Sequence, residues 1–123
     1  MTRMLDEINR SKKYLEPVFD KFDTYNWDDV VRNVVQGRWF LLAYPKGALL
    51  IEFLQYPRKK TMYILGAGGD LDEITNAQED LERIAKKQGC KDIEIRGRKG
   101  WSKIANKFKG YKTHYVVINK EII

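Results

Sequence analysis

Apolar residues in the first part of the chain recur at intervals of three and four positions. Between residues 5 and 22 they include Ile8 and Leu15, and this spacing predicts a helix with one apolar side. Pro17 lies within the run, so we expect the helix to be disturbed or restarted there. The same type of pattern predicts a second helix over residues 27–35.

After residue 37 the pattern changes to stretches rich in aromatic, β-branched and aliphatic side chains, which are typical of strands. The predicted strands cover residues 38–44, 48–56 and 61–65. Two short breaks that contain Pro45 and Pro57 separate them, and such breaks favour an antiparallel meander. The glycine-rich stretch 66–69 is expected to break the sheet.

Capping residues mark the expected ends of the helices. Asn26 is a suitable N-cap for the helix over residues 27–35, and Gly37 is its expected stop. Asp70 or Asp72 is expected to cap a long helix that reaches about residue 88, where Gly89 closes it.

The rest of the chain predicts one more strand, a short helix and a last strand. Residues 91–96 alternate isoleucines with charged residues, as a strand beside the long helix would. Residues 111–119 supply the last strand. The short helix between these strands has apolar residues at positions i, i+3, i+4 and i+7, namely Trp101, Ile104, Ala105 and Phe108.

The predicted order is therefore two helices, three strands, and then helix, strand, helix and strand. A strand–helix–strand unit of this length implies a parallel pair of strands with a right-handed crossover. The fold class is α+β, with a mixed sheet that could also be described as α/β. We expect residues 1–123 to form a single domain, since a chain of 123 residues is long enough for one core.

Composition restricts the classes of protein. Hydrophobic residues make up 43% of the chain and charged residues 33%, which indicates a soluble globular protein. An apolar run of membrane-spanning length is absent and the first residues lack the core of a signal peptide, so we expect a cytoplasmic protein. One cysteine, Cys90, and one histidine, His114, predict neither an internal disulfide nor a metal site, and Cys90 is expected to be structural.

Positive charge is concentrated between residues 86 and 112, which contain ten basic residues and two acidic ones. Such a segment could bind nucleic acid or an acidic protein surface, with Trp101 stacking on a base, or it could be a solvated face with Trp101 in the core. The candidate contact residues are Arg96, Arg98, Lys99, Lys103, Lys107 and Lys109.

The order of elements resembles the GNAT family of N-acetyltransferases over nearly the whole chain. Four local patterns are Tyr56-Pro57, Ala85 to Cys90, Gly97 to Trp101 and Gly110-Tyr111. These patterns are similar to those of small GNAT-like proteins encoded by tailed bacteriophages, which are assigned as acetyltransferases or as internal virion proteins.

The resemblance implies that acetyl-CoA lies where the last strand of the meander separates from the next strand. Backbone groups of Tyr63, Ile64, Leu65 and Gly66 would then bind the pantetheine arm. The glycines of the family's phosphate-binding turn correspond here to Asp72 and Ile74, whereas this chain has its glycines earlier, at Gly66, Gly68 and Gly69. These glycines are either a shifted phosphate loop or unrelated to phosphate, in which case Asp70 and Asp72 simply cap the helix.

The resemblance also places Asn106 where many of these enzymes have a tyrosine that protonates the departing thiolate. Asparagine donates a hydrogen bond but is not a proton source, so Asn106 is a candidate cofactor contact. Tyr111 is our candidate acid, with Tyr63 and Tyr115 as alternatives, although strand tyrosines are more often packing residues. Because Glu52 lies in the middle of an apolar strand, it either faces the cleft as the general base or points to solvent; His114 has no partner for such a role.

Two functions therefore remain. The first is an acyltransferase that moves an acetyl group from acetyl-CoA to an unknown amine. The second is a non-catalytic GNAT-fold phage protein that acts in virion assembly or in nucleic-acid binding.

Overall fold

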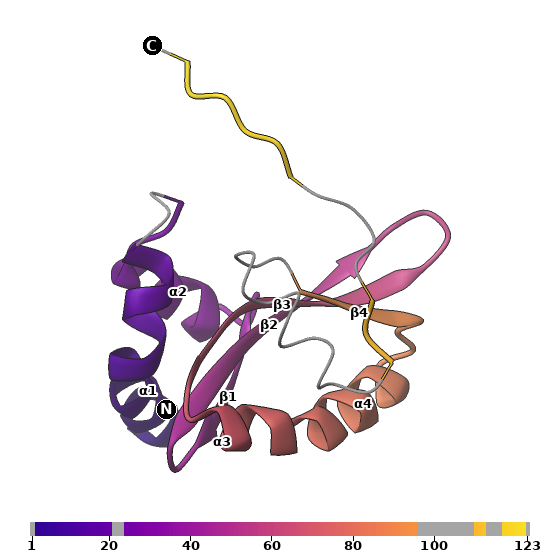
Figure 1. Cartoon of the computed structure of the whole chain (residues 1–123). Coiled ribbons are helices and arrows are strands. Elements are labelled where there is room, and N and C mark those ends of the chain that lie inside the picture. Colours follow the sequence, from indigo (N-terminus) through magenta and orange to yellow (C-terminus); the bar gives the residue numbers. More distant parts are fainter. Residues whose placement is uncertain (1, 21–23, 96–109, 113–116, 123) are drawn as a thin grey trace.

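In the part of the chain that the structure describes, four strands form one mixed sheet with helices on both of its faces (Figure 1). The computed structural model describes residues 2–20, 24–95, 110–112 and 117–122. Its helices are α1 (Thr2–Asp20), α2 (Trp27–Val35), α3 (Leu71–Asn76) and α4 (Gln78–Lys87). Its strands are β1 (Phe40–Tyr44), β2 (Gly47–Gln55), β3 (Lys60–Gly69) and β4 (Asp92–Ile95).

The strands lie side by side in the order β1-β2-β3-β4. The first three form an antiparallel meander, and β4 pairs in parallel with β3 after the crossover through α3 and α4. This topology confirms the predicted α+β class with a mixed sheet.

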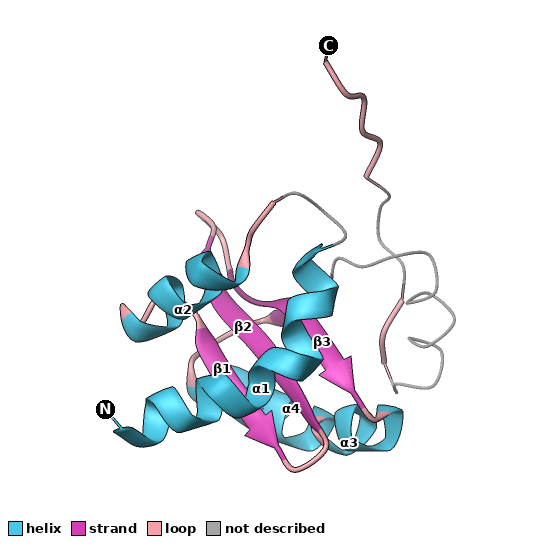
Figure 2. Cartoon of the chain, turned by 90° about the vertical axis from the view of Figure 1, so that its left-hand side faces the viewer, coloured by secondary structure: helices cyan, strands magenta, loops and turns pink. Residues whose placement is uncertain are grey.

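Two hydrophobic clusters hold the layers together. Helices α1 and α2 cover one face, and α3 and α4 cover the other (Figures 1 and 2). Strand β2 serves both faces because its side chains alternate: Ala48 and Leu50 pack towards α1 and α2, whereas Leu49 and Ile51 pack towards α4.

The predicted caps are present. Asn26 accepts a hydrogen bond from the backbone N–H of Asp29 at 2.9 Å, and the Asp29 carboxylate accepts one from the backbone N–H of Asn26 at 3.0 Å. This reciprocal pair is a capping box at the start of α2. Of the two candidates for the next helix start, Asp70 is the N-cap, since its carboxylate accepts a hydrogen bond from the N–H of Asp72 at 2.8 Å.

Two helix predictions were wrong. Helix α1 continues through Pro17 without a restart, because buried Leu15 and Phe19, on either side of the proline, keep both turns packed on the sheet. The predicted long helix is divided into α3 and α4 at Ala77. At this point the side-chain amide of Gln78 donates to the carbonyl of Ile74 at 3.3 Å, in the place of a backbone donor.

The glycine-rich stretch does not break the sheet. Gly66 to Gly69 belong to β3 and pair with β2, from Gly66 opposite Leu50 to Gly69 opposite Gly47. The expectation failed because these glycines have a packing role within the strand, described below. Strand β1 also begins two residues later than predicted, at Phe40.

The last two predicted elements include residues outside the described ranges. The short helix built on Trp101 to Phe108 lies outside the described residues. The last strand, predicted over residues 111–119, is absent at its described ends, 111–112 and 117–119. Tyr111 packs against α4 instead, through a hydrogen bond to Gln78.

Candidate functional site

The described pairing of β3 with β4 covers only the first part of β3. Their parallel pairing runs from Thr61 opposite Asp92 to Ile64 opposite Ile95. Strand β3 then continues for five more residues, Leu65 to Gly69, and within the described residues Gly66 to Gly69 pair only with β2. One edge of this part of β3 therefore has no described strand partner, and we call it the open β3 edge.

An irregularity in β3 lies at the same point. Ile51 pairs with Ile64 but Leu50 pairs with Gly66, so Leu65 is one extra residue in β3. Such a bulge increases the local twist of a strand and turns the side chains that follow. The side chain of Leu65 packs with the cluster under α1 and α2, whereas Ile64 is buried on the α4 face.

The glycines of β3 allow α1 to lie directly on the strand. A Cβ atom at Gly68 would lie 2.0 Å from the backbone oxygen of Tyr14, and one at Gly66 would lie 3.1 Å from the ring of Phe19. Both positions therefore serve close packing of α1. The predicted backbone contacts of Tyr63, Ile64, Leu65, Gly66, Gly68 and Gly69 with a cofactor remain predictions.

Glu52 lies beside the end of the described β3–β4 pairing. It pairs across the sheet with Tyr63, the residue before the last β3–β4 pair. Its half-buried carboxylate accepts a hydrogen bond from the indole N–H of Trp39 at 3.2 Å. Trp39 is buried and contacts Tyr25 edge-on, with the ring centroids 4.9 Å apart. Glu52 thus has one oxygen held in place on the α1/α2 face.

The contact of Trp39 with Glu52 was not predicted, although the sequence contains a signal for it. A two-residue turn at Pro45 and Lys46 sets the hairpin register, which places Tyr44 opposite Gly47 and Phe40 opposite Ile51. One further step places Trp39 opposite Glu52. Counting back from the turn would therefore have found this pair.

Tyr111 is not close to Glu52 in the structure. Its hydroxyl donates to the side-chain oxygen of Gln78 at 2.9 Å, at the start of α4, which covers the other face of the sheet. Burial raises the pKa of Tyr111 from 10.0 to about 12, with a smaller contribution from the charge of Glu82. Tyr111 therefore keeps its proton at neutral pH, and the structure does not bring the two predicted catalytic residues together.

We predict that Tyr111 makes the stability of the protein depend on alkaline pH. Its pKa is higher in the folded state than in the unfolded state, so its contribution is complete below pH 10 and is lost as the pH rises to about 12. Urea unfolding at a series of pH values should show a steeper alkaline loss in wild type than in Tyr111→Phe. The control is Tyr56→Phe, at an exposed tyrosine; equal slopes for wild type and Tyr111→Phe would contradict the assignment.

Carboxylates occupy the start of α3, where the open β3 edge ends. Asp70 caps the helix, and Glu73 accepts a hydrogen bond from the backbone N–H of Lys46 at 3.2 Å. Together with Asp72 they make this helix start acidic. Their negative charge stabilises the helix but repels a diphosphate. The hydrogen bond from the N–H of Asp72 confirms the predicted role of Asp70 as a cap.

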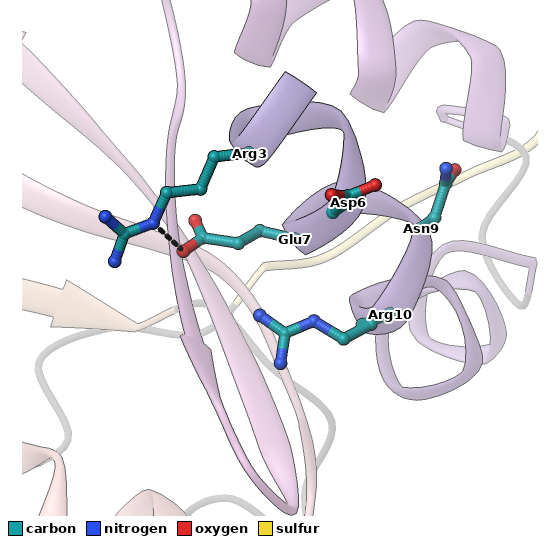
Figure 3. Close-up of a pocket in the computed structure, with 5 residues that line it drawn as sticks. All are labelled: Arg3, Asp6, Glu7, Asn9 and Arg10. Carbon is teal, nitrogen blue, oxygen red and sulfur yellow. Dashed lines mark ion pairs between the residues drawn. The ribbon is translucent and has the colours of Figure 1, made fainter. Parts of the chain in front are cut away.

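Two hollows lie along α1. The larger, of about 550 Å³, is lined by Arg3, Asp6, Glu7, Asn9 and Arg10. Figure 3 shows that Arg3, Glu7 and Arg10 point to one side of the helix, with Arg3 and Glu7 in an ion pair at 3.9 Å, while Asp6 and Asn9 point elsewhere. All five residues come from one helix, so this hollow is a surface feature separate from the open β3 edge.

The remaining candidates add no further chemistry to this site. Burial raises the pKa of the half-buried thiol of Cys90, which agrees with a structural role. In the described part of the chain, His, Cys, Asp and Glu side chains form no group of three that could hold a metal ion. None of its helices combines the length and apolar character needed to cross a membrane. Several predicted residues lie outside the described ranges, namely Arg96, Arg98, Lys99, Trp101, Lys103, Asn106, Lys107, Lys109, His114 and Tyr115.

Comparison with known proteins identifies the fold. The sequence matches no protein-family model and no curated protein. Among solved structures, an aminoglycoside acetyltransferase from an uncultured soil metagenomic sample, in complex with sisomicin, has a TM-score of 0.66 at 14% identity, over 97% of this chain and 88% of that chain. A possible acetyltransferase from Clostridium difficile 630 has a TM-score of 0.65 at 11% identity, over 96% and 93% of the two chains. An acetyltransferase from Trypanosoma brucei has a TM-score of 0.60 at 12% identity, over 79% and 78%.

The chain therefore has a GNAT-like fold. At these identities the similarity concerns the fold, and an activity must be argued from the site.

Proposed function

We propose that this protein is an N-acyltransferase that transfers an acetyl group from acetyl-CoA to an amine. The observation that carries the proposal is the position of Glu52 beside the last described β3–β4 pair, where the open β3 edge begins. A carboxylate at this point can accept a proton from an amine that reacts at the end of the open β3 edge. The acetyltransferase folds of the structural neighbours support the same class of reaction.

The open β3 edge fits one part of acetyl-CoA. In the described part of the chain the backbone N–H and C=O groups of this edge face no strand partner. Such groups favour an extended, amide-containing chain, and the pantetheine arm has this character. The acidic start of α3 does not fit the diphosphate. We propose that the cations immediately after Ile95, namely Arg96, Arg98 and Lys99, bind the diphosphate, and that Asn106 is a further contact.

The chemical role of Glu52 follows from its contacts. The hydrogen bond from Trp39 to Oε2 fixes the orientation of the Glu52 carboxylate. Among the described residues this carboxylate forms no ion pair. Acetyl-CoA would supply the acetyl thioester, and Glu52 would take the proton that the amine loses.

A thermal-shift titration tests the proposal. Acetyl-CoA that binds only the folded state should raise the unfolding temperature as its concentration rises, and at 100 times the Kd it should add about 2.7 kcal/mol of stability. ATP is the control, since it shares the adenine and phosphates but has no pantetheine. An unchanged unfolding temperature at millimolar acetyl-CoA would rule out the proposal.

We predict that Asp70→Asn increases the affinity for acetyl-CoA. Asparagine also accepts the capping hydrogen bond, so stability should change little. Removal of one negative charge at a helix start should tighten binding about two- to fivefold, the equivalent of ~0.3–1 kcal/mol. The control is Asp28→Asn in the first turn of α2; calorimetric titration that gives the same Kd for both variants would contradict the prediction.

The acidic start of α3 also favours a second candidate function, a binding protein with this fold but without acyl transfer. In this proposal the protein is a phage virion or assembly component, and the basic residues between 96 and 109 contact nucleic acid or an acidic protein surface. Titration of labelled DNA at increasing salt tests it, because phosphate contacts make affinity fall steeply with ionic strength. Absence of binding at low salt would argue against the nucleic-acid form of this function.

A further inference from the structure

The apolar side of α1 extends beyond the edge of the sheet. Its sheet-facing residues Ile8, Ser11, Leu15 and Phe19 are buried. Met4 lies one turn before Ile8 on the same side of the helix, yet it is 41% exposed, and its neighbour Leu5 is 42% exposed. Figure 2 shows the reason: the N-terminal half of α1 passes over β1 and continues beyond it.

The crossing point of α1 over β1 is marked by a hollow of about 190 Å³. Its lining includes Asn9 and Tyr14 of α1 together with Ala43 and Tyr44 of β1. Met4 precedes Asn9 by more than one helical turn, about 7.5 Å along the axis. The first turn of the apolar side therefore has no strand of the described sheet beneath it.

Strand β1 presents an unprotected edge at this place. In the described part of the chain it pairs only with β2. Its five residues carry no charge, and Phe40 is 44% exposed. Charged residues and prolines are the usual protection of edge strands against pairing, and β4, at the opposite edge, carries Asp92 and Glu94. The edge of β1 and the exposed turn with Met4 and Leu5 together form a place for one more strand, which we call the β1 slot.

The segment 117–122 has the properties of a strand that fills such a slot. It has no secondary structure, and Val117, Ile118 and Ile122 are 73%, 91% and 84% exposed. Six extended residues span about 20 Å, enough to pair along the five residues of β1. Large exposed β-branched side chains gain free energy when they are buried on a sheet.

We propose that segment 117–122 of a second copy of this chain pairs with β1, and that reciprocal exchange of the two segments forms a closed two-fold dimer. Pairing with the β1 of a second copy is favoured over pairing with the β1 of the same chain, because segment 117–122 lies far from its own β1. Tyr111 is tied to α4 by its bond to Gln78, and in Figures 1 and 2 the segment points away from the body of its own chain.

Light scattering on the full chain, over a range of protein concentrations, tests the dimer. Wild type should have the mass of two chains, and Ile118→Lys and Phe40→Lys should each have the mass of one. The control is Leu71→Lys on α3, at a residue 38% exposed and outside the β1 slot, which should remain dimeric. Circular dichroism checks that each variant is folded, and Ile118→Lys is the decisive variant because its exposed side chain contributes little to the fold of one copy.

Three results would overturn the proposal. These are a wild type with the mass of one chain at high concentration, a dimer that persists in Ile118→Lys, and a Leu71→Lys variant that dissociates as readily as the others. The mass is measured without acetyl-CoA, so the outcome is independent of the proposed acyl transfer.

Discussion

Gly68→Ala should destabilise the protein by about 3 kcal/mol, in the upper part of the usual range for an overpacked site. The added Cβ would lie 2.0 Å from the backbone oxygen of Tyr14. A backbone atom of a helix cannot move alone, so the methyl group must push α1 away from β3. Urea unfolding followed by circular dichroism measures the change as a lower midpoint.

Gly66→Ala is the matched control, since it makes the same change on the same strand beneath the same helix. Its Cβ would meet the end of the Phe19 ring at 3.1 Å, and a side chain can shift at a cost of about 1 kcal/mol. Equal losses of stability in the two variants would show that α1 does not rest on Gly68.

Glu52→Gln should reduce the rate of acetyl transfer by about 10²- to 10⁴-fold, the usual contribution of a general base. Glutamine has nearly the same shape and still accepts the hydrogen bond from Trp39. The variant therefore removes the proton acceptor and keeps the local structure. The measurement is release of free thiol from acetyl-CoA with a panel of amines, at several pH values.

Tyr111→Phe is the comparison for this experiment, because its hydroxyl bonds to Gln78 on the side of α4. It should retain the acetyl-transfer rate to within a few fold. A Glu52→Gln variant as active as wild type would remove Glu52 from the mechanism. A large loss in Tyr111→Phe with normal folding would instead restore the tyrosine as the acid.

Much of the fold could be predicted because local patterns agreed with the final packing. The caps at Asn26 and Asp70 and the turn at Pro45 specify local structure through hydrogen bonds and turn geometry. The predictions for Pro17 and for the glycines of β3 were wrong, and both failures have one cause. Intrinsic preference was overridden by the packing of α1 on β3, a contact between segments about 50 positions apart in the sequence.

The candidate site was predictable only in part. The position of Glu52 in an apolar strand marked it as unusual, but its hydrogen-bond partner depends on hairpin register. Tyr111 and Glu52 were predicted as one catalytic pair because strand and residue type do not reveal which face of the sheet a residue reaches. The structure separates them through the bond of Tyr111 to α4.

Hydrogen–deuterium exchange with and without saturating acetyl-CoA tests the central claim most directly. The account predicts slower exchange of backbone amides between Leu65 and Gly69, where β3 extends beyond its described pairing with β4. Exchange in the first turns of α1, along the hollow lined by Arg3 and Arg10, should stay the same. Unchanged exchange along β3, or protection confined to α1, would contradict acetyl-CoA binding at the open β3 edge.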